Sequence, residues 1–418
     1  MNRNDRSITG FVMVSHAIVH TYELSIPILM VLWLSEFSVS TALLGTVVAV
    51  GYGLFGVGAL PGGILVDRFG SQELVTACLA GMGASFLLLS IAPNVLTIMG
   101  ALCVWGLAAS VYHPAGLSLI SKGVEERGTG FAYHGMAGNL GIALGPLLTA
   151  VLLLFFEWRI VTVLLIAPTA VAVLYAISVE FDETAAVQAQ ADGGTPASKR
   201  RGTLAQFVAD SRSLFTVGFT VAFFVVMMNG LFYRGTLTFL PDVLSGFLPN
   251  VTDQMQLFDP GSPMAEEFDP ASYLYAGLLM VGIAGQYVGG KLTDRIRTEV
   301  GLAVVFGSLT VVAIVFVPAA ETGIVPLLIV SALLGFLLFA LQPLYQATIA
   351  EYSPPGDRGL SYGYTYLGSF GIGAAGAVIA GYLLSAGGVN TTFLGLAAFP
   401  VFGAALSLAL LRYGCLRE

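Results

Sequence analysis

Three ionisable side chains near the start of the chain, His16, His20 and Glu23, stand at positions i, i+4 and i+7. Residues at these separations share one face of an α-helix, so the two imidazoles and the carboxylate are expected to lie side by side. A carboxylate next to an imidazole favours the protonated ring, and such a ring can take up and release a proton near neutral pH. The trio therefore has the equipment for proton coupling.

The same trio allows two other interpretations. It could be a hydrogen-bonded network that holds its helix to neighbouring helices. A His-x3-His pair with a further carboxylate also fits one face of a Zn²⁺ site, but no cysteine or second His pair completes such a set. We expect neither a metal site nor a cofactor.

A further candidate for proton coupling, His113, stands between Tyr112 and Pro114 in the stretch GLAASVYHPAGLSLIS, residues 106–121. A proline inside a helix removes a backbone hydrogen bond and opens the helix about one turn earlier. The freed carbonyl and the His113 ring are then expected to face a polar cavity, with Tyr112 adding a hydroxyl and an aromatic wall. The alternative is a packing kink without a functional role.

All four histidines fall in long apolar stretches, so lipid must surround the elements that position them. The 418 residues are 56% hydrophobic and 10% charged, whereas soluble domains are about 25% charged. We find twelve apolar stretches of roughly 18–27 residues, each near the length that spans a bilayer as a helix. They lack the regular alternation of a membrane β-barrel. The sequence predicts an all-α membrane protein with twelve transmembrane helices.

The second half of the chain repeats the first. GGILVDRFG (62–70) recurs as GGKLTDRIR (289–297), GLAASVYHP (106–114) as GFLLFALQP (335–343), and RGTGFAYHG (127–135) as RGLSYGYTY (358–366). We predict two pseudo-symmetric six-helix bundles, at 1–179 and 213–418, joined by a cytoplasmic linker at 180–212. Two similar bundles with a site at their interface are typical of a secondary transporter.

The basic residues predict how the chain sits in the membrane. If both termini are cytoplasmic, all but two of the 17 Lys and Arg residues, Arg159 and Arg234, lie on the inner side. Positive charge accumulates on the cytoplasmic side of membrane proteins. We therefore expect a multi-pass protein of the cell membrane with both termini in the cytoplasm. The net charge of −8 offers no basis for nucleic-acid binding.

The proline kink recurs at Gln342-Pro343, whereas the ionisable group does not. The second half is therefore expected to supply mainly neutral contacts to a substrate. The candidate cavity residues are Tyr112, Asn139, Asn229, Arg234, Gln342, Tyr345 and Gln346. Asn139 could instead bond one helix to another. Arg234 could receive an anionic or phosphonate-like group, or extend to the outer surface.

The stretch GGILVDRFGSQ (62–72) resembles the loop 2–3 signature of the major facilitator superfamily, G-x-L-x-D-R-x-G, which recurs at Gly290, Leu292, Asp294 and Arg295. The resemblance implies the major facilitator fold, with gating contacts at cytoplasmic helix ends. Asp67 would meet the segment that starts near Arg358, and Asp294 the one that starts near Arg127. The gating candidates are Asp67, Arg68, Arg127, Asp294, Arg295 and Arg358. Ser71 and Gln72 replace the usual basic pair, which implies a weaker charge relay there.

Three further stretches, SHAIVHTYE (15–23), ASVYHPAGLSLIS (109–121) and HGMAGNLGIALGPLL (134–148), resemble the fosmidomycin-resistance branch of that superfamily. The branch implies an exporter that exchanges its substrate for protons. We expect proton antiport of a small organic or drug-like solute by alternating access, by a monomer. Uptake of a sugar or organic acid by symport or uniport stays open. The sequence holds no G-x-S-x-G or Walker motif, so we expect neither an enzyme nor an ATP-driven pump.

Overall fold

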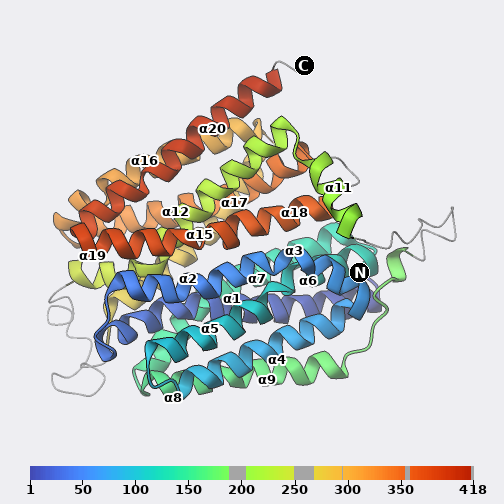
Figure 1. Cartoon of the computed structure of the whole chain (residues 1–418), viewed down its shortest axis with the longest axis horizontal. Helices are drawn as coiled ribbons and strands as arrows, with labels where there is room; N and C mark the ends of the chain where they lie inside the picture. Colours follow the sequence, from blue (N-terminus) through green and yellow to red (C-terminus); the bar gives the residue numbers. More distant parts are fainter. Residues whose placement is uncertain (188–203, 249–267, 294, 354–357, 416–418) are drawn as a thin grey trace.

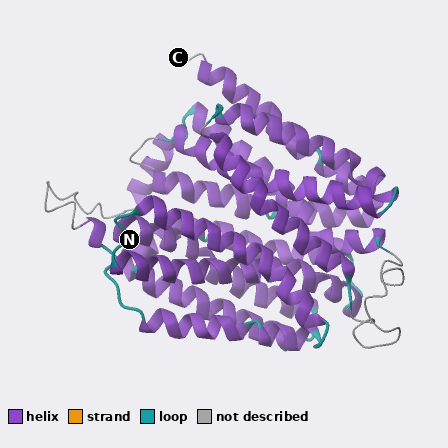
Figure 2. Ribbon diagram, turned by 180° about the vertical axis from the view of Figure 1, so that it is seen from behind, coloured by secondary structure: helices purple, strands orange, loops and turns teal. Residues whose placement is uncertain are grey.

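The structure is a computed structural model, and it describes residues 1–187, 204–248, 268–293, 295–353 and 358–415. These ranges are helical and contain no β-strand (Figure 2). The helices of the first half are α1 (Arg3–Glu36), α2 (Thr41–Val57), α3 (Ala59–Phe69), α4 (Ser71–Ser90), α5 (Val95–Ser110), α6 (Tyr112–Gly123), α7 (Arg127–Leu153), α8 (Trp158–Leu164) and α9 (Ile166–Ser178). Those that follow are α11 (Leu204–Leu214), α12 (Val217–Phe247), α15 (Pro270–Thr293), α16 (Thr298–Glu321), α17 (Ile324–Glu351), α18 (Arg358–Tyr366), the π-helical turn η2 (Leu367–Ile372), α19 (Ala375–Leu396) and α20 (Ala398–Cys415).

Eleven helical stretches within the described ranges are long and apolar enough to cross a membrane. The last of them, Leu360–Cys415, has 56 residues, which would extend about 84 Å as one helix against a hydrocarbon core of about 30 Å. It is broken at Gly388, whose φ of 72° and ψ of −170° are not helical. Because this stretch is long enough for two crossings and has a break between them, it agrees with the twelve spans that the sequence predicts.

The helices form two packed groups that lie one above the other in Figure 1. In the lower group α1 packs on α7, and α2 and α4 pack on α5; in the upper group α17 packs on α15 and α16, and α19 packs on α12. The groups meet where α2 lies along α19, α7 along α15 and α1 along α12. Further contacts between the groups join α2 to η2 and α3 to α18, so side chains on all of these helices can face a site between the groups.

Glycine contacts show that the sequence repeat is also a repeat in space. A Cβ atom on Gly106 would lie 2.1 Å from the carbonyl oxygen of Gly51, and one on Gly335 would lie 2.2 Å from that of Leu278. Gly335 follows Gly106 by 229 residues and Leu278 follows Gly51 by 227, the offsets of the sequence repeat. Both helix pairs approach so closely because no side chain separates the backbones.

A second pair of glycine contacts shows that α1 and α12 are equivalent helices in the two groups. A Cβ atom on Gly145 of α7 would lie 2.6 Å from the carbonyl oxygen of Thr21 on α1. One on Gly376 of α19 would lie 2.1 Å from that of Leu231 on α12. Gly376 follows Gly145 by 231 residues, again the repeat offset. Thr21 and Leu231 therefore hold equivalent places in the two groups.

The two prolines predicted to open their helices behave differently. Val111 separates α5 from α6 just before Pro114, as predicted. In the second half α17 continues through Pro343, so the helix is not divided there as it is at Val111, and the predicted kink at Pro343 stays a prediction. Pro343 packs toward Gly289 of α15, where a Cβ atom would lie 2.9 Å from its ring, and the long helix around it tolerates the missing backbone donor.

The departure from the loop 2–3 pattern has a structural explanation. Glu183 accepts hydrogen bonds from the backbone N–H groups of Ser71 at 2.9 Å and Gln72 at 2.7 Å, at the start of α4. The Gln72 side chain donates to the carbonyl oxygens of Ala176 and Val179 at the end of α9. A carboxylate is favoured at a helix N-terminus. The Gln72 side chain thus joins α4 to α9, while the backbone bonds to Glu183 do not depend on the residue type.

The contact between α2 and η2 yields a testable prediction. A Cβ atom on Gly56 would lie 1.8 Å from the backbone nitrogen of Gly371, whereas one on Gly53, on the same helix, would meet only the Cβ of Ala374 at 3.9 Å. Gly56→Ala is therefore expected to disfavour this arrangement of the two groups and to lower the transport rate at least tenfold. Gly53→Ala should transport like the parent. Equal rates for the two variants would show that this contact is not required in the transport cycle.

Candidate functional site

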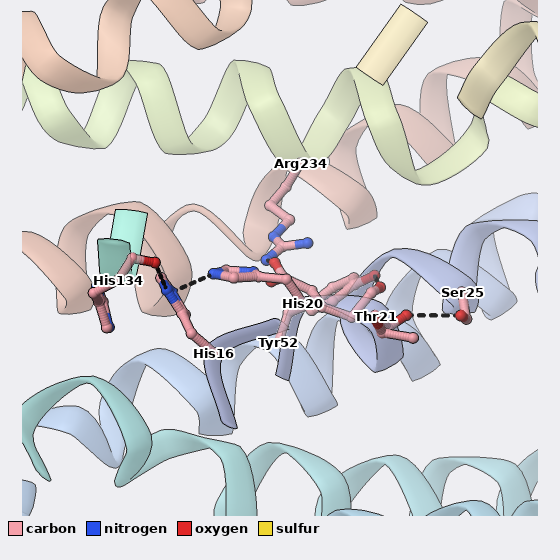
Figure 3. Close-up of polar contacts among 8 residues, drawn as sticks. His16, His20, Thr21, Ser25, Tyr52, His134 and Arg234 are labelled. Atoms are coloured by element: carbon pink, nitrogen blue, oxygen red, sulfur yellow. Dashed lines mark hydrogen bonds and ion pairs between the residues drawn. The ribbon is translucent and has the colours of Figure 1, made fainter. Parts of the chain in front are cut away.

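The polar centre of the molecule is a chain of four side chains that runs from α1 to α12, and Figure 3 labels three of them, His16, His20 and Arg234. The Nε2 atoms of His16 and His20 face each other at 3.0 Å. His20 Nδ1 lies 2.5 Å from Oε2 of Glu23, and Oε1 of Glu23 pairs with Arg234. Glu23 is 1% exposed and Arg234 2%. Arg234 therefore points into the molecule and does not extend to the outer surface.

The hydrogen-bond partners in this chain indicate which ring nitrogens carry a proton. His16 Nδ1 is 2.7 Å from the backbone carbonyl oxygen of His134, which can only accept, so this nitrogen carries a proton. His20 Nδ1 donates in the same way to Glu23, a carboxylate bound to a guanidinium. Two neutral rings in this arrangement would direct lone pairs at each other across 3.0 Å. One additional proton between the two Nε2 atoms makes the contact an N–H···N hydrogen bond of ordinary length.

The count of protons is the same whichever atom holds each one. If Glu23 held a proton and donated it to His20 Nδ1, then His20 Nε2 would donate to His16, and the total would not change. Relative to an ion pair of Glu23 with Arg234 and two neutral imidazoles, the network accommodates one extra proton. Its net charge is then one positive unit.

The ion pair lies where the two halves of the chain are equivalent. Because Thr21 corresponds to Leu231, Glu23 corresponds to Tyr233, the neighbour of Arg234. A carboxylate from one half thus meets a guanidinium from almost the same place in the other half. The pair joins α1 to α12, so it is a direct polar link between the two packed groups.

Aromatic rings enclose the ion pair. The guanidinium carbon of Arg234 lies 3.8 Å from the ring centre of Tyr52 on α2 and 5.2 Å from that of Phe370 on η2. The Tyr52 hydroxyl donates to the backbone carbonyl of Glu23 at 3.2 Å. Cation–π contacts of this kind contribute up to about 2 kcal/mol when they are desolvated. Tyr52 therefore supports both members of the pair.

His113 lies beside the histidine pair, buried among rings. Its ring centre is 5.3 Å from that of His16 and 5.6 Å from that of His20, and it stacks on Tyr366 at 4.4 Å. One nitrogen from each of the three histidines lies within 4.8 Å of the others. The structure thus brings all four proton-coupling candidates, His16, His20, Glu23 and His113, into one buried cluster.

The three histidine nitrogens would also suit three corners of a tetrahedral Zn²⁺ site. Two nitrogens bound to zinc at about 2.05 Å are roughly 3.3 Å apart in that geometry. The 3.0 Å between the Nε2 atoms of His16 and His20 is shorter and matches a direct hydrogen bond. A zinc ion at this place would therefore require the His16 and His20 rings to move apart by a few tenths of an ångström.

The candidate cavity residues are distributed on both sides of this cluster. The Tyr112 hydroxyl donates to the Val12 carbonyl at 2.7 Å, which ties α6 to α1. Asn229 is buried on α12, and its Oδ1 atom has no hydrogen-bond partner among the described residues. Tyr345 is buried on α17, and the remaining members are half-buried: Asn139, Gln342 and Gln346.

Several residues at the centre were not selected from the sequence. The backbone carbonyl of His134 fixes His16, and no sequence pattern identifies a backbone acceptor. Tyr52 sits in a glycine-rich apolar stretch without a polar neighbour that would mark it. Tyr275 on α15 is fully buried close to Arg234, and its hydroxyl has no partner in the described part of the chain.

The structure gives only partial information on the gating candidates. Helices α3 and α18, which carry Asp67 and Arg358, pack on each other. The side chains of Asp67, Arg127 and Arg358 lie outside the described residues, as does Asp294 entirely. Arg68 and Arg295 are exposed. The proposed gating contacts therefore stay predictions.

The comparison with known families decides the identity of the fold. The model of the Major Facilitator Superfamily matches residues 11–326 and again residues 257–414. The chain belongs to this superfamily. Its members are secondary transporters and not enzymes, in agreement with the sequence predictions.

Individual proteins agree with the superfamily assignment. The uncharacterized MFS-type transporter YfnC of Bacillus subtilis is 28% identical over 321 residues, 75% of this chain and 71% of that protein. Two shorter matches are 32% identical: the puromycin resistance protein pur8 of Streptomyces alboniger over 108 residues (25% and 22% of the two chains), and a Na⁺, Li⁺, K⁺/H⁺ antiporter of Planococcus maritimus over 124 residues (27% and 28%). The solved nucleoside transporter NupG superposes with a TM-score of 0.77 at 13% identity, over 96% of this chain and 99% of that one. These matches support the superfamily, and the fosmidomycin-resistance branch stays a proposal.

Proposed function

We propose that this superfamily member exports a small organic or drug-like solute in exchange for protons. The observation that carries the proposal is the 3.0 Å contact between the Nε2 atoms of His16 and His20, which accommodates one proton beyond the neutral state. Two relatives add support, since one is a resistance protein and one an antiporter by name. The buried position of the contact, at a place where α1 meets α12, suits a coupling site.

The geometry also suggests how the proton acts on the protein. Loss of the shared proton leaves two lone pairs opposed in a buried place, so His16 and His20 must separate. If the His20 ring is the one that moves, its Nδ1–H leaves Oε2 of Glu23, while Oε1 keeps its contact with Arg234. Proton occupancy then changes the surroundings of an ion pair that links α1 to α12. Such a difference between two states is what a coupling ion needs in order to shift their populations.

A second candidate is symport of an organic anion with a proton. It is favoured by Arg234, whose Nε–H is buried without a partner among the described residues and could donate to an oxyanion. In that case the anion and the proton would bind together, because each compensates the charge of the other.

Flux measurements on the purified protein in proteoliposomes test both candidates. With an outwardly or inwardly directed pH gradient imposed, antiport predicts that solute moves against the direction of proton flow, and symport predicts movement with it. A panel of radiolabelled cations, anions and neutral solutes covers the open substrate question. Transport that ignores the pH gradient for every solute would contradict proton coupling.

The orientation in the membrane is tested by cysteine labelling. Ser38, between α1 and α2, and Ser213, near the end of α11, are both exposed. Figure 1 shows the N-terminus and α11 at one end of the molecule and α8 at the other. In a variant without Cys78, Cys103 and Cys415, we expect Ser38→Cys to react with an impermeant maleimide from outside intact cells. Ser213→Cys should react only after permeabilisation. The opposite pattern would invert the proposed topology.

A further inference from the structure

We propose that His16, His20 and His113 form a binding site for a divalent transition-metal ion such as Zn²⁺, in which the metal takes the place between His16 and His20 that a proton would occupy. Metal binding by the three rings does not depend on the function of the protein. Its consequence for transport, inhibition, rests on the proposed proton antiport.

The first argument is the set of donor atoms. The pair on α1, with its carboxylate, is too small a set to hold a metal, which is why no metal site is expected from the sequence alone. The fold adds a third imidazole from α6, since one nitrogen each of His16, His20 and His113 lies within 4.8 Å of the other two. All three residues are buried, between 4% and 7% exposed. Three neutral imidazoles are a common ligand set for zinc and leave one position open.

The second argument is the orientation of two of the rings. A metal-bound histidine typically donates its other ring N–H to a carboxylate or a backbone carbonyl, which fixes the tautomer of the ring. His20 Nδ1 lies 2.5 Å from Oε2 of Glu23, and His16 Nδ1 lies 2.7 Å from the carbonyl oxygen of His134. The two Nε2 atoms are left facing each other at 3.0 Å. Two of the three ligands are thus already held as a metal requires.

Small movements complete the coordination geometry. Two nitrogens on a tetrahedral zinc ion are roughly 3.3 Å apart, so His16 and His20 must separate by a few tenths of an ångström. The His113 nitrogen, at most 4.8 Å from the others, must approach by up to about 1.5 Å. A turn of roughly 30° about its side-chain torsions moves a ring nitrogen that far. His113 is held by ring contacts, the nearest to Tyr366 at 4.4 Å, and these permit such a turn.

The third argument is the charge of the buried network. With the shared proton, the network of Arg234, ionised Glu23 and the imidazole pair has one positive unit of charge. A dication in place of the proton raises the charge to two units, and one chloride in the open fourth position returns it to one. Buried charges are costly unless they are balanced. Replacement of the proton by a metal ion with one bound anion therefore leaves the charge beside Arg234 unchanged.

The type of ligand determines which metals fit. Imidazole nitrogens suit Zn²⁺, Co²⁺, Ni²⁺ and Cu²⁺, whereas Mg²⁺ and Ca²⁺ require oxygen ligands. The carboxylate beside the rings, Glu23, has one oxygen paired with Arg234 and the other in contact with His20. We therefore expect the site to discriminate strongly against Mg²⁺ and Ca²⁺.

A cavity offers the metal a route to the rings. It has a volume of about 510 Å³ and lies between the first turns of α1 and α7, where its lining includes Thr9, Met13 and Tyr133. Met13 stands three residues before His16, so the two share a face of α1. Thr9 Oγ1 is buried without a partner among the described residues. The cavity therefore comes within one helical turn of the first ligand.

The test measures binding of Co²⁺ and Zn²⁺ to the detergent-solubilised full-length protein, with any affinity tag removed and with Cys78, Cys103 and Cys415 replaced by serine. Tetrahedral Co²⁺ absorbs visible light much more strongly than the octahedral hydrated ion. We expect one Co²⁺ per chain with a tetrahedral spectrum, displaced by Zn²⁺ and not by Mg²⁺ or Ca²⁺. An octahedral spectrum, displacement by Mg²⁺, or no binding overturns the inference.

Proton release tests whether the metal takes the place of the proton. In weakly buffered chloride solution near neutral pH, we expect about one proton to leave per metal ion bound. The titratable groups that surround the three rings are Glu23 on α1, Tyr52 on α2, Tyr112 on α6, His134 on α7, Arg234 on α12 and Tyr366 on α18. Metal binding without proton release would contradict the replacement.

Two histidine variants identify the ligands. Loss of a partner that orients a ligand typically lowers metal affinity 10–100-fold, so His113→Gln, which removes a ligand, is expected to lower it at least about a hundredfold. His134→Gln removes a ring outside the donor set and keeps the carbonyl that orients His16, so we expect a loss of about tenfold or less. Equal losses for the two variants, or full affinity in His113→Gln, would contradict the proposed ligand set.

Flux in proteoliposomes separates this inference from the proposed antiport. We expect Zn²⁺ to inhibit pH-driven flux of the parent, because the metal holds the lone pairs that the coupling proton needs, and His113→Gln to resist this inhibition. If the metal binds but flux ignores the pH gradient, the metal site stands and proton antiport is wrong. If flux follows the gradient and no metal binds, antiport stands and the metal site is wrong. Coupled flux that continues with the metal bound would show that proton and metal do not share one place.

Discussion

Arg234→Met is expected to lower the free energy of unfolding by roughly 3–5 kcal/mol, the loss typical when one member of a buried ion pair is removed. Glu23 is 1% exposed and would be left buried without a guanidinium beside it. The double variant Glu23→Gln/Arg234→Met removes both charges, so we expect it to recover most of the stability. The measurement is equilibrium or thermal unfolding of the purified protein in detergent.

A matched control for this prediction is Arg159→Met. Arg159 pairs with Glu36 at 2.7 Å, but both side chains are about one third exposed. Exposed pairs contribute only about 0–1 kcal/mol. If Arg234→Met unfolds no more easily than Arg159→Met, the link between α1 and α12 does not contribute to stability as we describe.

His20→Gln is expected to abolish accumulation of solute against its gradient, because glutamine cannot take up the proton that the Nε2 contact accommodates. Accumulation is measured in proteoliposomes under an imposed pH gradient, with solute counterflow in the absence of the gradient as the readout for binding and exchange. We expect the accumulation ratio to fall to one while counterflow continues. Wild-type accumulation by His20→Gln would contradict the proposed proton site.

Two other histidines serve as controls. His134 contributes its backbone carbonyl to His16, and the Nε2 atom of its ring has no partner among the described residues. His134→Gln keeps this carbonyl but removes the ring that stacks on His16 at 3.8 Å, so it tests whether coupling needs the ring or only the backbone acceptor. His113→Gln separates the proton from a metal, because His113 would be a zinc ligand but has only ring contacts with the histidine pair. Retained accumulation supports the proton, and loss of both accumulation and zinc binding would support the metal.

Most of the fold could be predicted from the sequence because lipid imposes a simple requirement. Each span needs a long apolar stretch, and the duplication relates the two halves. The break at Val111 followed from Pro114 alone. The continuity of α17 at Pro343 did not, because the outcome depends on how the helix packs on α15. The role of Ser71 and Gln72 was equally hidden, since their partner Glu183 lies more than a hundred residues away.

The candidate site could likewise be predicted from the sequence only in part. His16, His20 and Glu23 could be grouped because helix periodicity alone places them together. The partner of Glu23 could not be identified, because Arg234 lies 211 residues further along and reaches it only through the crossing of α1 and α12. The proton count was also beyond sequence analysis. It depends on the direction of each ring nitrogen and on a backbone carbonyl, neither of which a pattern of residue types records.

The π-helical turn η2 lies between α18 and α19, so a change in its hydrogen bonding would shift these two helices relative to each other. Its backbone N–H groups bond five residues back, as Gly373 does to Gly368 at 3.0 Å. Tightening this turn to α-helical bonding would shift α18 against α19 by one residue, about 1.5 Å along the axis and 100° around it. Tyr366 and Phe370 would then turn away from His113 while α19 kept its place along α2. We infer that a change within η2 alone can move the rings of Tyr366 and Phe370 beside the proton site, without rotation of a whole helix bundle. Unchanged distances from spin-labelled α18 to α19 across the transport cycle would contradict this.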